Sequence, residues 1–231
     1  MRTFDLHIHS KYSIDCVTPP KEILRQAHKL GLSGIAITDH GTVKGGLETR
    51  KANTSKDLEV IVGTEVNTDA GDLMGLFVHE EIKAKHWGDF VRQVHAQGGI
   101  VVLPHPFRGH RLSDDLVRAV DAIETMNGKT WASANRNAME LARKFGKPTI
   151  GGSDAHFHKE VGSCVTLVDG HDLKKAILSG KVSAKGTHAP AYRESMTEAI
   201  SAFKKREYRK LPKATVQFFH RLVVREEERE A

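Results

Sequence analysis

The sequence predicts an α/β fold whose strands close into a barrel, and two observations lead to this prediction. Apolar strand-type segments alternate with segments of helical periodicity about seven times, which is typical of a parallel sheet with crossover helices. Polar side chains follow nearly every predicted strand. They can converge only in a ring of strands, because an open sheet gathers ligands only beside its switch point. A chain of 231 residues is short for a full eight-stranded barrel, so we expect a distorted barrel or one with fewer strands.

The predicted strands are short apolar runs that end at polar residues, Gly or Pro. The run at 58–62 is apolar except for Glu59 and is interpreted as a buried strand. In chain order the predicted strands span residues 2–8, 34–38, 58–62, 73–78, 100–103, 122–126, 148–151 and 164–168.

Three of the predicted helices end at glycine, whereas the one at 44–54 is polar. In the first of them Pro20 opens the helix, Ile23, Leu24 and Ala27 share one face, and Gly31 ends it. Gly98 and Gly146 end two later helices in the same way. The predicted helices span residues 20–30, 44–54, 82–97, 112–120, 131–145 and 172–178.

The domain organisation predicted from these elements is a barrel domain at 1–193 and a helical, basic C-terminal extension at 194–231. In the extension, two apolar faces at helical spacing lie on either side of Pro212, one of Ala199, Ile200 and Phe203 and one of Val216, Phe218, Phe219, Leu222 and Val223. One interpretation is a helical cap on the barrel with a frayed charged end. The other is an arm that docks a partner or nucleic acid through Lys204, Lys205, Arg206, Arg209 and Lys210.

Composition narrows the classes of function. The formal net charge is +6, and residues 204–231 hold nine Lys/Arg against five Asp/Glu, which favours anionic partners without specifying nucleic acid. No apolar run is long enough to cross a bilayer, and Met1 leads directly into a strand, so we expect a cytoplasmic protein that binds no membrane. Cys16 and Cys164 form no disulfide or zinc-finger pattern and are expected to be reduced thiols.

The residues at the predicted strand ends have the chemistry of metal ligands. His7 and His9 are two apart on a strand, so they project from the same face. The full set of candidate ligands is His7, His9, Asp15, His40, Glu65, His79, His105, Asp154 and His156. Six imidazoles and three carboxylates suit Mn²⁺, Zn²⁺ or Fe, and nine ligands exceed the needs of one tetrahedral ion. We therefore expect two to three divalent ions, with Glu65 and Asp154 as bridges.

Five motifs occur in a fixed order over residues 3–157, about two thirds of the chain: Asp5–Ser10, Thr38–His40, Gly63–Glu65, His105–Pro106 and Gly152–His156. Together they resemble the successive motifs of the PHP family, the polymerase and histidinol phosphatase superfamily. The resemblance implies a distorted (β/α)7 TIM-like barrel with a metal cluster at the carboxyl ends of its strands. It also implies hydrolysis of phosphate esters.

The same resemblance implies how the ligands divide among three ions. One ion would take His7, His9, Glu65 and Asp154; a second Glu65, His79 and His105; a third Asp15, His40 and His156. Some family members have a histidine at the position of Asp15, and the loop also offers Ser13. His79 has no distinctive motif, and its assignment depends on its position after a strand.

A water that bridges two such ions loses its proton near neutral pH, and the hydroxide would attack phosphorus in line. Arg108, three residues after His105, is expected to clamp the phosphate, with Lys44 and Arg136 as weaker candidates. Asp39 is expected either to orient a ligand imidazole as part of the catalytic site or to cap the next turn. The remaining candidates are Glu124, which either supports the cluster or ends a strand, and His110, which either contacts substrate or lies on the surface.

The predicted activity is hydrolysis of a small phosphorylated substrate, either a nucleotide or a short oligonucleotide. A histidinol-phosphate phosphatase would use the same cluster with a different pocket. A metal-dependent amidohydrolase also begins with His-x-His on a barrel strand, although many of those use a carbamylated lysine as the bridge, where Glu65 stands here. A scaffold that binds RNA or protein is the third alternative, but a scaffold has no need of nine ligands.

Overall fold

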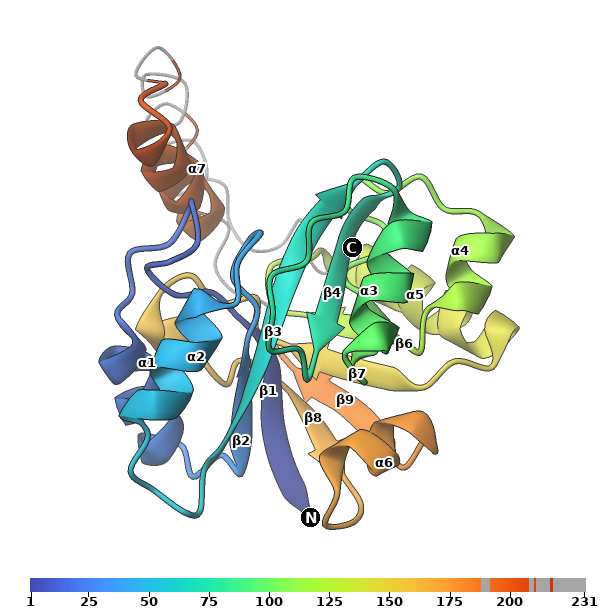
Figure 1. Ribbon diagram of the computed structural model, residues 1–231, viewed down its shortest axis with the longest axis horizontal. Coiled ribbons are helices and arrows are strands. Elements are labelled where there is room, and N and C mark those ends of the chain that lie inside the picture. The colour runs from blue at the N-terminus through green and yellow to red at the C-terminus, as the bar shows by residue number, and fades with distance from the viewer. Residues whose placement is uncertain (188–191, 208–209, 211–216, 218–231) are drawn as a thin grey trace.

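The computed structural model describes residues 1–187, 192–207, 210 and 217. Its strands form one nine-stranded sheet in the order β7-β6-β5-β4-β3-β2-β1-β8-β9, curled into a nearly closed barrel (Figure 1). The strands are β1 (Arg2–Ile8), β2 (Gly34–Ile37), β3 (Glu59–Thr68), β4 (Gly71–Leu76), β5 (Ile100–Leu103), β6 (Ala122–Asn127), β7 (Thr149–Gly152), β8 (Cys164–Val168) and β9 (Val182–Gly186). The predicted α/β barrel is therefore confirmed, and β9 is an additional strand that the sequence did not indicate.

The helices lie outside the strands and follow the predicted positions closely. They are α1 (Pro20–Lys29), α2 (Lys44–Ala52), α3 (Trp87–Ala96), α4 (Asp114–Ala119), α5 (Ala132–Phe145), α6 (Leu173–Leu178) and α7 (Tyr192–Lys204). The helix predicted from residue 82 begins at Trp87 instead. The Nδ1 atom of His86 accepts from the Gly88 N–H at 3.1 Å and caps it, while the Lys85 carbonyl accepts from the Asp69 N–H at 2.8 Å and keeps the preceding stretch out of the helix.

The barrel closes where β1 meets the chain that follows β7. Ile8 and Ala155 form a parallel bridge, and the His9 N–H donates to the Ala155 carbonyl at 2.9 Å. At the other end of the seam β8 lies between the two strands. It pairs antiparallel with β1, and its Thr166 hydroxyl exchanges hydrogen bonds with the backbone of Gly151 on β7. The seam brings the ends of the first and seventh strands together.

Two strands run against the prediction of a fully parallel ring, β8, which is antiparallel to β1, and β4. Only Asp69 and Ala70 separate β3 from β4, and a parallel pair needs a crossover of a dozen residues or more. The two strands consequently form an antiparallel hairpin in which Glu65 lies opposite Met74. Because β4 runs backwards, its first residues lie at the carboxyl ends of the parallel strands and its last residues lie at their amino ends.

The barrel interior is a continuous apolar cluster contributed by successive strands, including Phe4, Leu6, Ile61, Met74, Leu76, Ile100, Val102 and Ile150. Leu173 and Ile177 of α6 belong to the same cluster, so α6 covers the amino-terminal opening of the barrel (Figure 1). Each fully buried side chain of this size contributes about 1.5–3 kcal/mol. The apolar filling of this end leaves the carboxyl ends of the strands as the place where polar side chains gather.

The described part of the C-terminal extension is α7 with a few residues after it. Figure 1 shows this helix standing beyond the carboxyl ends of the strands, next to the loop that follows β1. Thr197 and Ala202 are buried, whereas Phe203, predicted to share an apolar face with Ala199 and Ile200, is 64% exposed. The second apolar face predicted at 216–223 lies outside the described residues, as does Arg209. Within the described chain every helix is too short or too polar to span a bilayer.

Replacing Gly152 with Ala tests the closure of the barrel. A Cβ atom on Gly152 would lie 2.3 Å from the Cβ of His7 and 2.8 Å from its backbone nitrogen, so β7 would be forced away from β1. We expect Gly152→Ala to lower the free energy of unfolding by about 1–3 kcal/mol, the usual cost of overpacking. Chemical denaturation measures the loss.

Gly88→Ala is the matched control, since its added Cβ would meet only the exposed His86 ring, at 3.2 Å. Equal stability of the two variants would contradict the tight approach of β7 to β1.

Candidate metal centre

Eight of the nine predicted ligands converge at the carboxyl ends of the parallel strands, the exception being His79. They come from the end of β1, the loop after it, the loop after β2, the middle of β3, the loop after β5 and the loop after β7. The eight are His7, His9, Asp15, His40, Glu65, His105, Asp154 and His156. All but His40 and Asp15 are buried, so this is an interior cluster of imidazoles and carboxylates with one open side.

The first group of ligand atoms comprises the Nε2 atoms of His7 and His9 with Glu65 and Asp154. The two Nε2 atoms are 3.2 Å apart, and Glu65 Oε2 is 3.4 Å from each. Asp154 Oδ1 is 3.3 Å from His9 Nε2 and 3.7 Å from His7 Nε2. Atoms that lie 2.0–2.1 Å from a tetrahedral ion are about 3.3 Å from one another, so the atoms of His7, His9 and Glu65 fit one metal ion, and Asp154 Oδ1 lies beside the same two imidazoles.

The second group surrounds Asp15. Its Oδ2 atom lies 2.9 Å from His156 Nε2 and 3.3 Å from His40 Nε2, and His9 completes the group. The Oδ1 atom of Asp15 is buried with no hydrogen-bond partner among the described residues. The placement of Asp15 rather than Ser13 in the centre follows, because the Ser13 hydroxyl instead contacts His9 Nδ1 at 3.2 Å and accepts from the His40 N–H.

The third group joins Glu65 and His105, whose Oε1 and Nε2 atoms are 3.0 Å apart. Here the structure differs from the prediction. His79 is exposed and lies at the amino-terminal half of β3, near Glu59 and Val60, because β4 runs antiparallel and carries it to the opposite end of the barrel. Asp72, at the start of β4, lies with Glu65 and His105 in its place.

Glu124 on β6 contacts two residues of the cluster from the interior of the barrel. Glu124 Oε1 lies 3.0 Å from His7 Nδ1, and Glu124 Oε2 accepts from the backbone N–H of His105 at 3.0 Å and the side-chain amide of Asn127 at 2.9 Å. Such outer partners fix the tautomer and direction of ligand imidazoles. Of the two interpretations of Glu124, the structure supports the one in which it holds the centre together.

Asp39 does not orient a ligand imidazole. Its two carboxylate oxygens accept from the N–H and the hydroxyl of Ser10, so its role is to hold the loop that follows His9. Burial raises the pKa of Asp39 to about 6 in spite of these hydrogen bonds. If Asp39 contributes to catalysis, as predicted, it would do so through the position of this loop and not by contact with the cluster.

Two ligands occupy backbone conformations that residues other than glycine rarely adopt. His105 has φ +28° and Asp154 has φ +53°. Conformations of this kind cost about 1–3 kcal/mol and persist only when surrounding contacts enforce them. The Glu124 carboxylate holds His105, and the Asn127 amide donates to Asp154 Oδ2 at 3.3 Å. The strained backbone conformations therefore occur at His105 and Asp154, two residues whose side chains must point into the cluster.

Protons and metal ions compete for the same side-chain atoms of the cluster, and the pKa values show where protons bind. Burial favours the neutral form of Asp154, yet its pKa lies well below the usual value because Arg108 and His7 are adjacent. Burial also opposes charge on His40, but the Glu65 and Asp15 carboxylates raise its pKa to about 9. The pKa of His9 is lowered to about 3 by burial and by the neighbouring His156 and His40. His9 is consequently a neutral ligand, whereas His40 carries a proton that a metal ion must displace.

The predicted substrate residues divide into two groups. Arg108 donates from Nη2 to Asp154 Oδ2 at 2.8 Å and is 39% exposed, so it borders both the cluster and the solvent. His110 donates from Nε2 to the Asp72 carbonyl at 2.7 Å and lies against the His105 ring, behind the cluster. Lys44 and Arg136 are exposed on α2 and α5, and the structure does not bring either of them to the cavity beside the cluster.

The sequence reasoning missed Lys129. Its Nζ atom lies 2.6 Å from His156 Nδ1 and 3.3 Å from the Thr197 hydroxyl of α7. The residue follows β6 by two positions, so the rule that strand ends carry the site would have found it if extended past Asn127.

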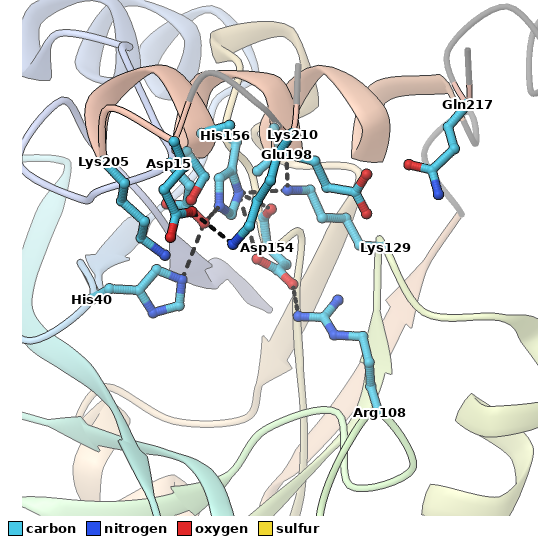
Figure 2. A pocket seen from close by; sticks show the side chains of 14 residues that line it. Asp15, His40, Arg108, Lys129, Asp154, His156, Glu198, Lys205, Lys210 and Gln217 are labelled. Carbon is cyan, nitrogen blue, oxygen red and sulfur yellow. Dashed lines mark hydrogen bonds and ion pairs between the residues drawn. The ribbon is translucent and has the colours of Figure 1, made fainter. Parts of the chain in front are cut away.

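A cavity of about 510 Å³ opens above the cluster. Figure 2 shows its side chains: Asp15, His40, Arg108, Lys129, Asp154 and His156 come from the barrel, and Glu198, Lys205, Lys210 and Gln217 come from the C-terminal extension. This is within the usual size range of small-molecule sites. A buried cluster of imidazoles and carboxylates at the mouth of an α/β barrel, open to a cavity lined by cations and carboxylates, is typical of the class of metal-dependent barrel enzymes.

Comparison with known proteins places the chain within that class. The PHP domain family model matches residues 5–208, so the chain belongs to the PHP domain family and the resemblance of its five motifs is confirmed. The uncharacterized proteins MJ1587 and MJ0417 of Methanocaldococcus jannaschii are 38% and 32% identical to it over 141 and 171 residues. These matches cover 53% and 69% of this chain and 80% and 67% of the relatives.

A solved structure shares the fold. It is a two-domain protein from Bacteroides vulgatus that contains a predicted PHP-like metal-dependent phosphoesterase. It superposes with a TM-score of 0.69 at 20% identity, over 80% of this chain and 65% of that one.

Metal binding should release protons in a way that depends on pH. Below pH 9 the His40 imidazole is protonated in the metal-free protein, so each ion that binds there must displace a proton. We expect Mn²⁺ titrations at pH 7 to give heats that vary with the ionisation enthalpy of the buffer, and to vary less near pH 9. The variant His40→Gln should release fewer protons at pH 7. Heats that are independent of the buffer would contradict the protonated state of the cluster.

Proposed function

We propose that this protein is a metal-dependent phosphoesterase that hydrolyses a small phosphorylated substrate, a nucleotide or a short oligonucleotide. The observation that carries the proposal is the position of Arg108. Its guanidinium bonds to Asp154, a ligand in the first group, and it also faces the cavity. A phosphate that approaches the cluster from the cavity meets this guanidinium, and a planar fork of donors suits phosphate oxygens.

The residues present fit two to three divalent ions of Mn, Zn or Fe. The donor set mixes imidazoles with carboxylates, and the atoms of His7, His9 and Glu65 have the spacing of ligands to one ion. Buried oxygen and nitrogen atoms of Asp15 and His105 lack hydrogen-bond partners among the described residues. Glu65 would be shared, since its Oε1 faces His105 while its Oε2 faces His7, His9 and His40. When bound, the ions would supply an ionised water near neutral pH and neutralise charge on the phosphoryl group.

The side chains of the chain itself would divide the remaining work. Arg108 binds and orients the phosphate, and Lys129 adds a second cation on the same wall, beside His156. Glu124 holds the His7 ring in place. Removing one preorganised donor to a transition-state oxygen typically costs 10²–10³ in turnover, so Arg108 is expected to matter at about that level.

Two alternatives are less well supported. A carbamylated lysine of the amidohydrolase kind has no place here, because the Glu65 carboxylate occupies the bridging position between the ligand groups. A scaffold without activity would gain nothing from burying this many titratable groups, each of which costs free energy when unpaired. Histidinol phosphate remains an alternative substrate that only a test of activity can separate from nucleotides.

Elemental analysis of the purified protein tests the metal centre. We expect two to three ions per chain after loading with Mn²⁺, and a loss of at least one ion in His9→Ala. His79→Ala is the matched control and should keep the full content, because the structure places His79 at the other end of the barrel. A loss of metal in His79→Ala equal to that in His9→Ala would contradict this ligand assignment.

Phosphate release from a panel of substrates tests the activity. The panel holds nucleoside monophosphates, a short oligoribonucleotide and histidinol phosphate, each with Mn²⁺. We expect turnover of a nucleotide substrate that falls more than about 100-fold in His9→Ala, since loss of even an outer partner of a metal ligand costs 10–100-fold. Arg108→Lys should keep the metal content and raise KM. Best turnover of histidinol phosphate would overturn the assignment to nucleotides, and a metal-loaded protein with no turnover would overturn the phosphoesterase.

A further inference from the structure

The loop that carries the ligand Asp15 joins β1 to α1 and is fixed to the barrel at both of its ends. At its start, the Ser10 N–H and hydroxyl donate to the Asp39 carboxylate. Near its end, the Thr18 hydroxyl donates to the His156 carbonyl at 2.9 Å. The stretch between these two attachments contains Asp15, so the position of the carboxylate depends on what holds the middle of the loop.

Three backbone carbonyls in this middle stretch bind one ammonium group. The Nζ atom of Lys204 donates to the carbonyls of Lys11, Ser13 and Cys16 at 3.0, 2.7 and 2.5 Å. Among the described residues, the carbonyls of Lys11 and Cys16 accept from no other donor. Asp15 lies between Ser13 and Cys16 in the chain, so Lys204 binds the backbone on both sides of the metal ligand.

Lys204 is the last residue of α7, and its side chain is turned toward the barrel. It is half-buried, whereas Lys205 and Arg206 after it are exposed. A second contact joins the same helix to the barrel, since the Thr197 hydroxyl lies 3.3 Å from Lys129 Nζ. Hydrogen bonds from a charged donor are about twice as strong as neutral ones. The docking of α7 beside this loop (Figure 1) and the shape of the loop are therefore coupled.

Asp15 is the member of its ligand group that comes from this loop. Its Oδ2 atom lies 2.9 Å from His156 Nε2 and 3.3 Å from His40 Nε2, and His9 completes the group. The three histidines directly follow β1, β2 and β7, so the strands of the barrel place them. The carboxylate of Asp15 completes the group only when the loop holds it against these imidazoles.

We propose that Lys204 is a positioning residue for the metal centre. By binding the loop on both sides of Asp15, it holds the carboxylate in the ligand group of His9, His40 and His156. The C-terminal extension thereby sets how tightly this group binds a divalent ion. The inference rests on the metal centre of the proposed function, but it concerns metal affinity and not the hydrolysis of a substrate.

The sign of the effect on metal affinity separates positioning from simple charge. A positive charge near a cation site opposes metal binding, so removal of the Lys204 charge alone would tighten the binding of Mn²⁺. Loss of a positioning contact would weaken it. We expect Lys204→Met in the full chain to raise the Kd of one Mn²⁺ ion about tenfold or more, because losing an outer partner of a metal ligand typically costs 10–100-fold in affinity. Calorimetric titration measures this, and unchanged or tighter binding would overturn the proposal.

Two further variants show whether the effect is specific and whether it acts through Asp15. Arg206→Met is the matched control, since it removes a positive charge at the same end of α7 from an exposed side chain, and it should change each Kd less than about twofold. Asp15→Asn removes the carboxylate on which Lys204 acts. Adding Lys204→Met to Asp15→Asn should therefore weaken binding by less than about a further twofold. An equal loss in Arg206→Met, or a full additional loss in the double variant, would overturn the proposal.

Hydrogen exchange of the unmodified chain tests the same coupling without any substitution. Coupling between two events is reciprocal, so if the docking of α7 favours metal binding, metal binding must favour the docking of α7. We expect added Mn²⁺ to slow the exchange of backbone amides both in residues 11–18 and in α7, and to leave α6 at the other end of the barrel unchanged. Slower exchange in the loop with no change in α7 would overturn the proposal, even if Lys204→Met failed to fold.

The outcomes also distinguish this inference from the proposed function. Both readouts are metal binding, so they hold whether or not the protein hydrolyses a phosphate ester. An unmodified chain that binds no Mn²⁺ would overturn the metal centre and this inference with it. An unmodified chain that binds Mn²⁺, together with a Lys204→Met variant that binds it equally well, would overturn this inference alone.

Discussion

The carboxylate of Glu65 is the group on which the rest of the site depends. Its two oxygens lie 3.0–3.4 Å from ring nitrogens of four histidines, His105 on one oxygen and His7, His9 and His40 on the other. These histidines come from three different strand ends, so a single buried charge ties together segments that are distant in the sequence. A carboxylate buried this deeply is stable only with opposite charge beside it, whether that charge is a proton on an imidazole or a metal ion.

The fold supplies this carboxylate with its partners by closing the barrel. The bridge between Ile8 and Ala155 joins the ends of β1 and β7, and it brings His7 and His9 to Asp154. Gly152 is required at this seam because a side chain there would occupy the position of His7. The unusual backbone conformations of His105 and Asp154 arise at the same end of the barrel, where Glu124 and Asn127 of β6 hold both residues. The backbone strain at His105 and Asp154 therefore lowers the free energy of unfolding at the residues whose side chains must point into the centre.

The described part of the C-terminal extension lies at the cavity beside the cluster. Lys204 attaches α7 to the loop that carries Asp15, and the residues after it complete the cavity. Both sequence interpretations of the full segment, a cap and a docking arm, stay predictions, and in the described residues Lys205 and Lys210 line the cavity. A loss of α7 would remove one wall of the cavity together with three hydrogen bonds to the loop that carries Asp15.

The sequence by itself determined the alternation of strands and helices, the barrel and eight of the residues that converge in the cluster. These follow from local properties: strand periodicity places His7 and His9 on one face, and the five motifs identify the family. Only the tertiary structure decided the rest. The reversed direction of β4 replaced His79 with Asp72, and the packing of α7 onto a distant loop brought Lys205 to the cavity. The physical reason is that side-chain chemistry and periodicity are read along the chain, whereas strand direction and the docking of a helix depend on contacts between residues up to 193 positions apart.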